Sequence, residues 1–272
     1  MPFLTAKHGR LHYESIGEGR PIIMIHGFTN YGLSWAQQVP ELVHAGFRVI
    51  LPDLYGHGQS QPADTALTVP DLASGITDLM HHLRISRAIL CGLSLGGMVA
   101  QQLAVTAPAC VEALVVANSR ATFAEPALVE AVESWINVFL QPEGPLKRLA
   151  ITWPLLLNET YRESAAGHAA LSAWKQALAG VPGSSLANVA QGMTQFDLRD
   201  RISEITVPTC VISGDQDKLF PPEKTAEIAS AIRSSVFHTI EGGGHISSMD
   251  SPDTFNRLLL DFVRSRAPAA LA

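Results

Sequence analysis

Charged residues are scarce in this chain: Asp, Glu, Lys and Arg make up 16% of its 272 residues, against roughly 25% in an average soluble domain. The net charge is −6, and no lysine or arginine cluster stands out, which argues against a nucleic-acid partner. No apolar run approaches the roughly 18 residues that a membrane span needs, and the chain does not open with the basic-then-apolar pattern of a secretory signal. These absences agree with a soluble protein that has neither a nucleic-acid nor a membrane partner.

Cysteine is scarce too. The three cysteines, Cys91, Cys110 and Cys210, are odd in number and lie in or beside apolar runs. This pattern predicts buried, reduced thiols and a cytoplasmic protein. The chain has no HExxH motif, no cysteine pair at zinc spacing and no P-loop, so we expect neither a metal nor a cofactor. The oligomeric state stays open.

A Gly-x-Ser-x-Gly motif occupies residues 92–96, directly after an apolar run and directly before a helical pattern. In this strand–turn–helix setting the motif lifts a serine hydroxyl clear of the sheet end. Its glycines permit a turn that is too tight for a Cβ. Ser94 is therefore the candidate nucleophile, the alternative being a serine that only turns the chain.

A nucleophilic serine needs a base to take its proton and an acid to orient that base. Three histidines follow Ser94. His245 comes after a glycine run and a strand-like run, on a loop that could reach back over the sheet end. His238 lies inside that strand-like run and His168 inside a helical pattern, so we predict that His245 is the base.

The acid has two candidates. Asp215 and Asp217 both follow a buried-strand pattern at residues 209–214, and catalytic groups collect at such carboxyl ends in open α/β sheets. Residue chemistry alone does not choose between them.

An oxyanion hole needs two backbone N–H donors. Leu95, directly after the serine, is expected to supply one. Phe28, which follows the apolar run 21–25 and Gly27, is expected to supply the other. We interpret His26 as a residue that holds this loop by a hydrogen bond.

Short apolar runs alternate with helical patterns along most of the chain, after a hairpin at residues 3–6 and 11–15. This alternation predicts a parallel sheet that is covered on both faces. Helical patterns lie, among other places, at residues 34–45, 69–83 and 95–107.

The alternation stops between residues 120 and 197, where only helical stretches punctuated by Pro and Gly remain, around 127–140, 146–150, 162–178 and 187–194. We interpret 120–197 as a helical cap inserted into a core of residues 1–119 and 198–272. The cap contains Trp135, Trp153 and Trp174, which are candidates for binding the substrate.

Five landmarks in this order resemble those of the α/β-hydrolase family and cover nearly the whole chain: His26-Gly27-Phe28, the D-x-x-G-x-G-x-S segment at 53–60, the Ser94 motif, Gly-x-x-Asp at 214–217 and Gly244-His245. The resemblance implies an α/β-hydrolase fold with a mostly parallel eight-stranded sheet. It also implies that Asp217, the last residue of Gly-x-x-Asp, is the acid.

Residues 92–101, and residues 196–200 with 205–209, are more closely similar to 3-oxoadipate enol-lactonases and related small esterases. Where those lactonases tend to have an Asn-Ser-Leu-Gly type of turn, this chain has His-Gly-Phe-Thr at 26–29, a form common among broader esterases. The resemblance therefore implies an ester or a lactone as substrate.

Together these features predict a serine hydrolase that acts on a carboxylic ester or lactone through an acyl-enzyme. One alternative is hydrolysis of a carbon–carbon bond in a ring-cleavage diketone, for which the cap usually offers groups that bind a carboxylate. Arg120, Arg148 and Arg162 are the candidates for that role. Another alternative is a ligand receptor that keeps the fold without fast turnover.

Overall fold

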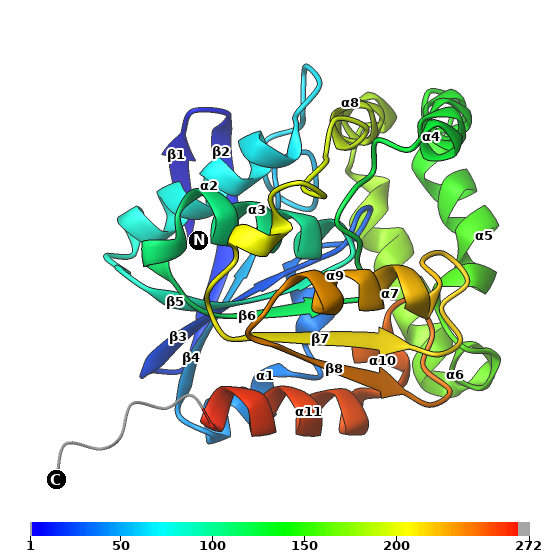
Figure 1. The fold of residues 1–272 in the computed structure, drawn as a ribbon. Coiled ribbons are helices and arrows are strands. Elements are labelled where there is room, and N and C mark those ends of the chain that lie inside the picture. The colour runs from blue at the N-terminus through cyan, green and yellow to red at the C-terminus, as the bar shows by residue number, and fades with distance from the viewer. Residues whose placement is uncertain (1, 266–272) are drawn as a thin grey trace, which may run out of the picture.

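The computed structural model describes residues 2–265 (Figure 1). These residues form one eight-stranded sheet in the order β1-β2-β4-β3-β5-β6-β7-β8. The strands are β1 Phe3–Ala6, β2 Gly9–Ile16, β3 Arg20–Ile25, β4 Phe47–Pro52, β5 Ala88–Leu93, β6 Val111–Ala117, β7 Thr209–Gly214 and β8 Ser235–Ile240. β2 runs antiparallel to β1 and β4, and all other neighbours pair in parallel. The predicted sheet is confirmed.

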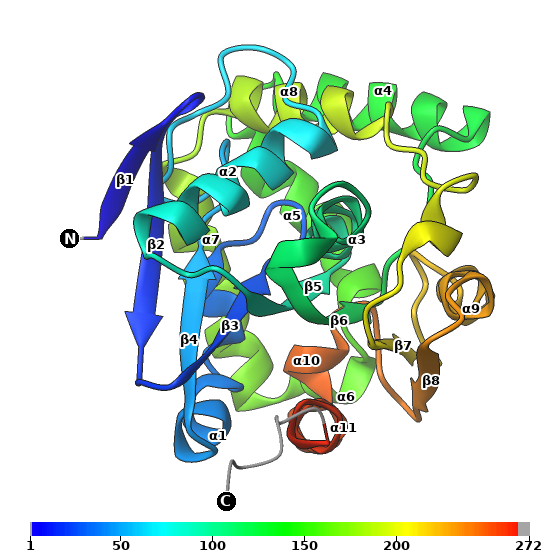
Figure 2. The same cartoon turned by 60° about the vertical axis from the view of Figure 1, so that its left-hand side comes forward.

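Helices cover both faces of the sheet (Figure 2). One face carries α1 Val39–His44 and α11 Pro252–Arg264, and the other carries α2 Val69–His82, α3 Leu95–Thr106 and α9 Pro222–Ala231. Alternate residues of β3 enter the two cores: Ile22 and Met24 pack with α1 and α11, whereas Ile23 and Ile25 pack with α2, α3 and α9. Because both faces are buried, the parallel strands read as continuous apolar runs.

Five helices lie between β6 and β7, beyond the carboxyl ends of the parallel strands (Figure 1). They are α4 Pro126–Phe139, α5 Gly144–Leu156, α6 Glu159–Glu163, α7 Ala165–Ala179 and α8 Gly183–Met193. We call residues 120–197 the cap. The chain enters and leaves the cap side by side, because Thr122 and Asp197 form an antiparallel bridge and the Leu198 N–H donates to Ala121 O at 2.8 Å.

The helices differ from the sequence prediction in four places. The stretch at 162–178 is two helices, because the Ser164 hydroxyl ends α6 on Tyr161 O and caps α7 on the Gly167 N–H. The helix expected at 34–45 is a 3-10 turn, Gly32–Trp35, followed by the short α1. The stretch at 146–150 extends to the whole of α5, although Pro154 lies inside it, because tertiary packing of its apolar side chains outweighs propensity. The short helix α10 Ser247–Asp250 was not expected.

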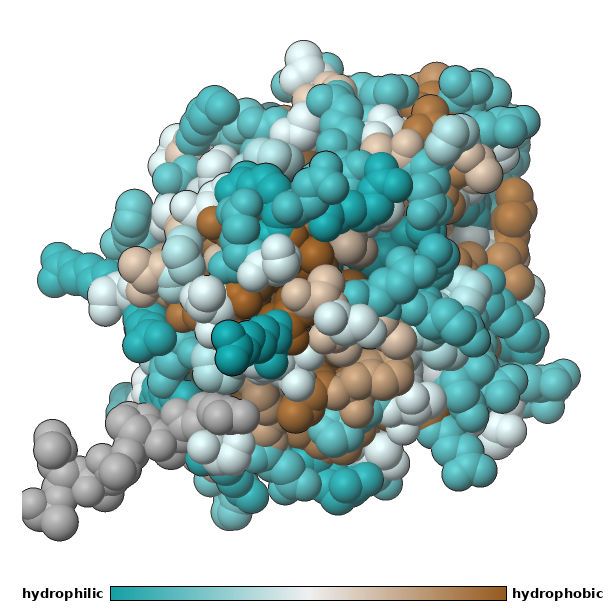
Figure 3. Space-filling model, in the orientation of Figure 1, coloured by the Kyte–Doolittle hydropathy of each residue, from teal (hydrophilic) through white to brown (hydrophobic). Residues whose placement is uncertain are grey.

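Figure 3 shows a mostly hydrophilic surface on one face, with hydrophobic side chains gathered in small areas. Cys91 and Cys210 are buried, Cys110 is half-buried, and none of the three forms a disulfide; burial raises the pKa of Cys210 to about 12. Within residues 2–265, no helix is long and apolar enough to cross a membrane. Nor do three or more His, Cys, Asp or Glu side chains gather there in a group that could hold a metal ion.

Candidate active site

Ser94 lies at a sharp turn between β5 and α3. Its backbone has φ 54° and ψ −115°, a conformation that is rare for a residue with a side chain. The chain can turn here because its neighbours are glycines. A Cβ on Gly96 would overlap the carbonyl oxygen of Ile25, and one on Gly92 would overlap that of Gly96. The motif therefore adopts the turn that its sequence predicts.

Three side chains that are far apart in the sequence form a hydrogen-bonded relay. Ser94 Oγ lies 3.0 Å from His245 Nε2, and His245 Nδ1 lies 2.9 Å from Asp217 Oδ2. All three residues are buried. Because Nδ1 faces a carboxylate, that nitrogen carries the proton, and Nε2 is left to accept from the serine hydroxyl. His168 is exposed on α7, and His238 lies within β8.

The two aspartates in the loop after β7 differ in burial and in hydrogen-bond partners. Asp217 is buried, and its Oδ1 accepts the N–H groups of Leu219 and Phe220 at 2.9 and 2.8 Å. Burial would raise the pKa of Asp217, but the charge and hydrogen bond of His245, with hydrogen bonds from the Phe220 N–H and the Asn118 side chain, lower the pKa below its ordinary value. Asp215 is exposed and accepts the Gly242 N–H at 2.8 Å. The side chain that reaches His245 is therefore Asp217.

Asn118 supports the relay and was missed in the sequence. It follows β6 in the left-handed conformation, with φ 45°. Its Nδ2 donates to Asp217 Oδ2 at 3.1 Å and to Gly244 O at 3.2 Å, and its Oδ1 accepts the Ser247 hydroxyl at 2.7 Å. The side chain thus joins the carboxylate to the loop that carries the histidine. The available signal was a polar residue directly after a buried strand.

The predicted oxyanion donors lie on either side of Ser94. Leu95 is the first residue of α3, so its N–H has no intrahelical partner. Phe28 follows Gly27, and a Cβ on Gly27 would lie 3.4 Å from Ser94 Cβ, so the loop after β3 packs directly against the serine turn. Both predicted donors therefore belong to segments that lie next to Ser94.

His26 holds this loop, as interpreted from the sequence. Its Nε2 accepts the Leu54 N–H at 2.9 Å, and its Nδ1 donates to Gly27 O at 2.8 Å. Complete burial lowers the pKa of His26, against the opposing charge of Asp53, so the ring is neutral. It joins the loop after β3 to the loop after β4.

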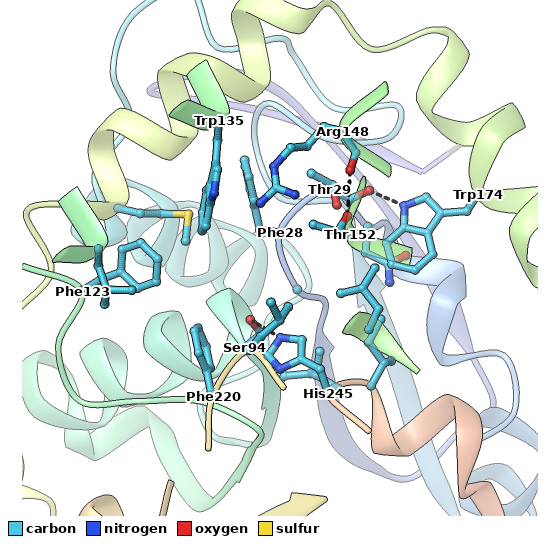
Figure 4. A pocket seen from close by; sticks show the side chains of 18 residues that line it. Phe28, Thr29, Ser94, Phe123, Trp135, Arg148, Thr152, Trp174, Phe220 and His245 are labelled. Atoms are coloured by element: carbon cyan, nitrogen blue, oxygen red, sulfur yellow. Dashed lines mark hydrogen bonds between the residues drawn. The ribbon is translucent and has the colours of Figure 1, made fainter. Parts of the chain in front are cut away.

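A cavity of about 110 Å³ lies between the core and the cap. Figure 4 shows Ser94 and His245 on its core side and side chains of the cap opposite them. Most of the lining is aliphatic or aromatic. The polar or charged side chains in it are Thr29, Asn30, Ser94, Arg148, Thr152 and His245. The relay therefore opens into a small, mostly apolar pocket.

Two of the three predicted tryptophans line this cavity. Trp135 stacks on Phe28 with ring centroids 6.3 Å apart, and Trp174 Nε1 donates to Thr29 O at 2.6 Å. Trp153 is not in the lining and packs edge to face against Trp174. The reason is helical geometry. One face of α5 lines the cavity, through residues 148, 152 and 156, and Trp153 is turned by about 100° from that face.

Of the three candidate arginines, only Arg148 lines the cavity. It is 8% exposed, with its guanidinium 4.6 Å from the centroid of the Trp135 ring. Burial lowers the pKa of Arg148 to about 10, so the side chain remains charged at neutral pH. Arg120 pairs with Glu125 at 2.6 Å, and Arg162 Nε donates to a backbone carbonyl.

Comparison with known proteins identifies the family. Residues 20–252 match the family model for the alpha/beta hydrolase fold. Because this match spans most of the chain, the protein belongs to the α/β-hydrolase family. The fold predicted from the five sequence landmarks is therefore confirmed.

The relatives are hydrolases and related enzymes of similar length. A "putative carbamate hydrolase" of Variovorax paradoxus is 30% identical over 96% of this chain and 99% of its own, and a "putative non-heme chloroperoxidase" of Synechocystis sp. is 29% identical over 97% and 100%. A 3-oxoadipate enol-lactonase of Acinetobacter baylyi is 27% identical over 87% and 85%. The predicted similarity to enol-lactonases is thus confirmed.

Among solved structures, a thermophilic esterase from Thermogutta terrifontis with malate bound superimposes with a TM-score of 0.90. It is 28% identical, and the match covers 98% of this chain and 99% of the esterase. Family membership and these relatives support a hydrolase with a small-molecule substrate.

Proposed function

We propose that this protein is a serine hydrolase that cleaves a carboxylic ester or lactone through an acyl-enzyme intermediate. The observation that carries the proposal is the relay from Ser94 through His245 to Asp217, which opens into a mostly apolar pocket under the cap. An esterase and an enol-lactonase among the relatives support the same reaction class.

In the proposed reaction, Ser94 Oγ attacks the carbonyl carbon while His245 Nε2 takes the hydroxyl proton. The N–H groups of Phe28 and Leu95 hold the resulting oxyanion. His245 then gives its proton to the leaving alkoxide, which departs as the alcohol, or as the ring-opened hydroxyl of a lactone. Asp217 keeps the imidazole in the required tautomer and stabilises the imidazolium. Water, activated by the same histidine, releases the acid and restores Ser94.

The cavity favours small substrates. Its volume is about 110 Å³, and a dry engineered cavity of roughly 150 Å³ in another protein holds benzene. A short acyl group or a small lactone fits this space, whereas a long acyl chain needs the cap to open. We therefore expect kcat/KM to fall as the acyl chain lengthens.

The test is a panel of p-nitrophenyl esters of increasing acyl length, run beside small lactones. We expect turnover of the short esters, and a loss of roughly 10⁴- to 10⁶-fold in kcat for Ser94→Ala. A fluorophosphonate should add one covalent group to the wild type and none to a folded Ser94→Ala. Wild-type turnover by that variant would refute the mechanism.

A second candidate is hydrolysis of a carbon–carbon bond in a vinylogous diketone, where the same histidine must also drive a tautomerisation. The charged Arg148 in the pocket favours it, because such substrates carry a carboxylate. Faster turnover of a dienoic diketone than of aryl esters would select this reaction. Tight ligand binding with negligible hydrolysis of either class would instead favour a receptor.

A further inference from the structure

Arg148 is a buried cation without an anionic partner. The described residues place no carboxylate within ion-pairing distance of it, and its Nε has no hydrogen-bond partner among them. Only 8% of the residue is exposed. Among the described residues, the guanidinium has one partner, the face of Trp135, whose centroid lies 4.6 Å from the guanidinium carbon. Such an arrangement is uncommon, because a buried charge is normally paired.

Two other arginines, one buried and one half-buried, show how guanidinium groups are paired elsewhere in this chain. Arg120 is as deeply buried as Arg148 and pairs with Glu125 at 2.6 Å. Arg20 pairs with Glu112 at 2.7 Å. Arg148 differs because its charge faces a cavity instead of a carboxylate of the protein.

The cost of this arrangement points to a ligand. An aromatic face compensates a cation only in part, and burial lowers the pKa of Arg148 to about 10 without removing the charge at neutral pH. A planar guanidinium with free N–H donors matches a carboxylate, which it can bind through two parallel hydrogen bonds. A carboxylate that enters the cavity would therefore compensate the charge of this guanidinium.

The position of Arg148 fits a substrate group. Figure 4 shows its guanidinium entering the cavity from the cap side, across from Ser94 and His245 on the core side. It projects from the same face of α5 as Thr152 and Leu156. A ligand that presents its carbonyl to Ser94 therefore has its other end toward Arg148.

We propose that the substrate carries a free carboxylate in addition to the bond that is cleaved, and that Arg148 binds this carboxylate. The inference rests on the proposed hydrolase function and narrows its substrate class to anionic monoesters or carboxylated lactones. Arg148 is a specificity residue in this proposal and takes no part in the proton transfers.

The test compares substrates that differ only in charge. The monomethyl esters of succinic, glutaric and adipic acid are matched with methyl esters in which a neutral amide replaces the free carboxylate, and the two members of each pair have nearly the same shape. A carboxylated γ-lactone is matched with its amide in the same way. Methanol release, or lactone opening, gives kcat/KM for each member of a pair. A hydrogen-bonded ion pair is expected to give the wild type a preference of roughly 10- to 100-fold for the carboxylate.

Two variants locate the source of that preference. Arg148→Met removes the charge and keeps much of the apolar stem, so the ratio of carboxylate to amide should fall to about one. Arg148→Lys keeps the charge and loses the planar pair of N–H donors, so its ratio of carboxylate to amide should be intermediate. Arg162→Met is the matched control, because this cap arginine lies outside the cavity lining and its loss should leave the ratio at the wild-type value.

The outcomes separate this inference from the proposed function. Equal ratios in the wild type and Arg148→Met, with normal ester turnover, would overturn the carboxylate site and leave the hydrolase intact. A wild type that turns over no ester or lactone and takes no fluorophosphonate would overturn the function itself. If Arg148→Met does not fold, inhibition of wild-type p-nitrophenyl acetate hydrolysis decides: inhibition by glutarate well below the concentration needed for glutaramide supports the site, and equal inhibition refutes it.

Discussion

Replacement of Asp217 by asparagine tests the relay with the loss of a single charge. Oδ1 of Asp217 accepts two backbone N–H groups, from Leu219 and Phe220, so the amide oxygen of the asparagine must take that place. Its NH₂ group then occupies the position of Oδ2, where it faces His245 Nδ1 and the Asn118 amide. The opposite orientation would set the NH₂ group against two N–H donors.

The expected result is a histidine in the wrong tautomer. With an NH₂ group opposite it, His245 keeps a hydrogen bond only if Nδ1 accepts, which places the proton on Nε2. Nε2 then cannot take the proton of Ser94. In chymotrypsin-like proteases the same change lowers kcat by about 10⁴, which corresponds to about 5 kcal/mol of activation free energy. We expect a loss of this order for Asp217→Asn.

Asp215→Asn is the matched control, two residues away on the same loop. Asp215 is exposed and accepts one N–H, which an amide oxygen also accepts, so kcat should change by less than about threefold. Single-turnover kinetics with p-nitrophenyl acetate, with circular dichroism to verify folding, measure both variants. A crippled Asp215→Asn beside an active Asp217→Asn would show that the acid is misassigned. Full activity in both would refute the relay.

Three further changes test the surroundings of the relay. Trp135→Ala or Trp174→Ala should shift the preferred acyl length, because each lost aromatic contact weakens substrate binding by roughly 1–3 kcal/mol. Trp153→Ala should keep the wild-type ranking of the ester panel, and a shift in Trp153→Ala alone would contradict the assigned lining. Asn118→Ala should lower kcat roughly 10- to 100-fold, because it removes a hydrogen bond to a carboxylate; an unchanged kcat would show that this amide does not support the relay. Folding raises the pKa of Asp250, chiefly by burial. A raised carboxyl pKa lowers stability above that pKa, so Asp250→Asn should raise the free energy of unfolding at pH 7, and the gain should shrink as the pH falls below the raised value and vanish below about 4. Urea unfolding at pH 7 and below about pH 4 measures this gain in stability, and a loss of stability in Asp250→Asn at pH 7 would contradict the prediction.

The fold and the central turn were predictable because local rules determine them. Buried parallel strands read as short apolar runs, and the glycines at 92 and 96 mark a turn that admits no Cβ. His245 was identifiable because few histidines follow Ser94 and only one comes after a strand. The choice of Asp217 over Asp215 needed the family resemblance, since both side chains follow the same strand, and their burial and hydrogen-bond partners leave no pattern in the sequence.

Asn118 was not predictable, for a physical reason. Its side chain bonds to groups 99, 126 and 129 residues away, and it reaches them from a left-handed backbone conformation. Neither feature leaves a periodic pattern in the sequence. The three cap tryptophans were equally indistinguishable, because their contribution depends on which face of a helix meets the core.

Under the proposed function, the position of helix α5 would let the cap select substrates without changing the chemistry. Residues 148, 152 and 156 recur every fourth position and line the cavity, so the rotation of this one helix determines which of its side chains a substrate meets. The proposed nucleophile, acid and base follow β5, β7 and β8, respectively, outside the cap. Because no relay residue belongs to α5, its cavity face can change in size and charge without moving the groups that transfer protons. We therefore expect related chains with the same relay to differ in substrate through these positions. In this chain, the unpaired Arg148 would select a substrate that carries a carboxylate.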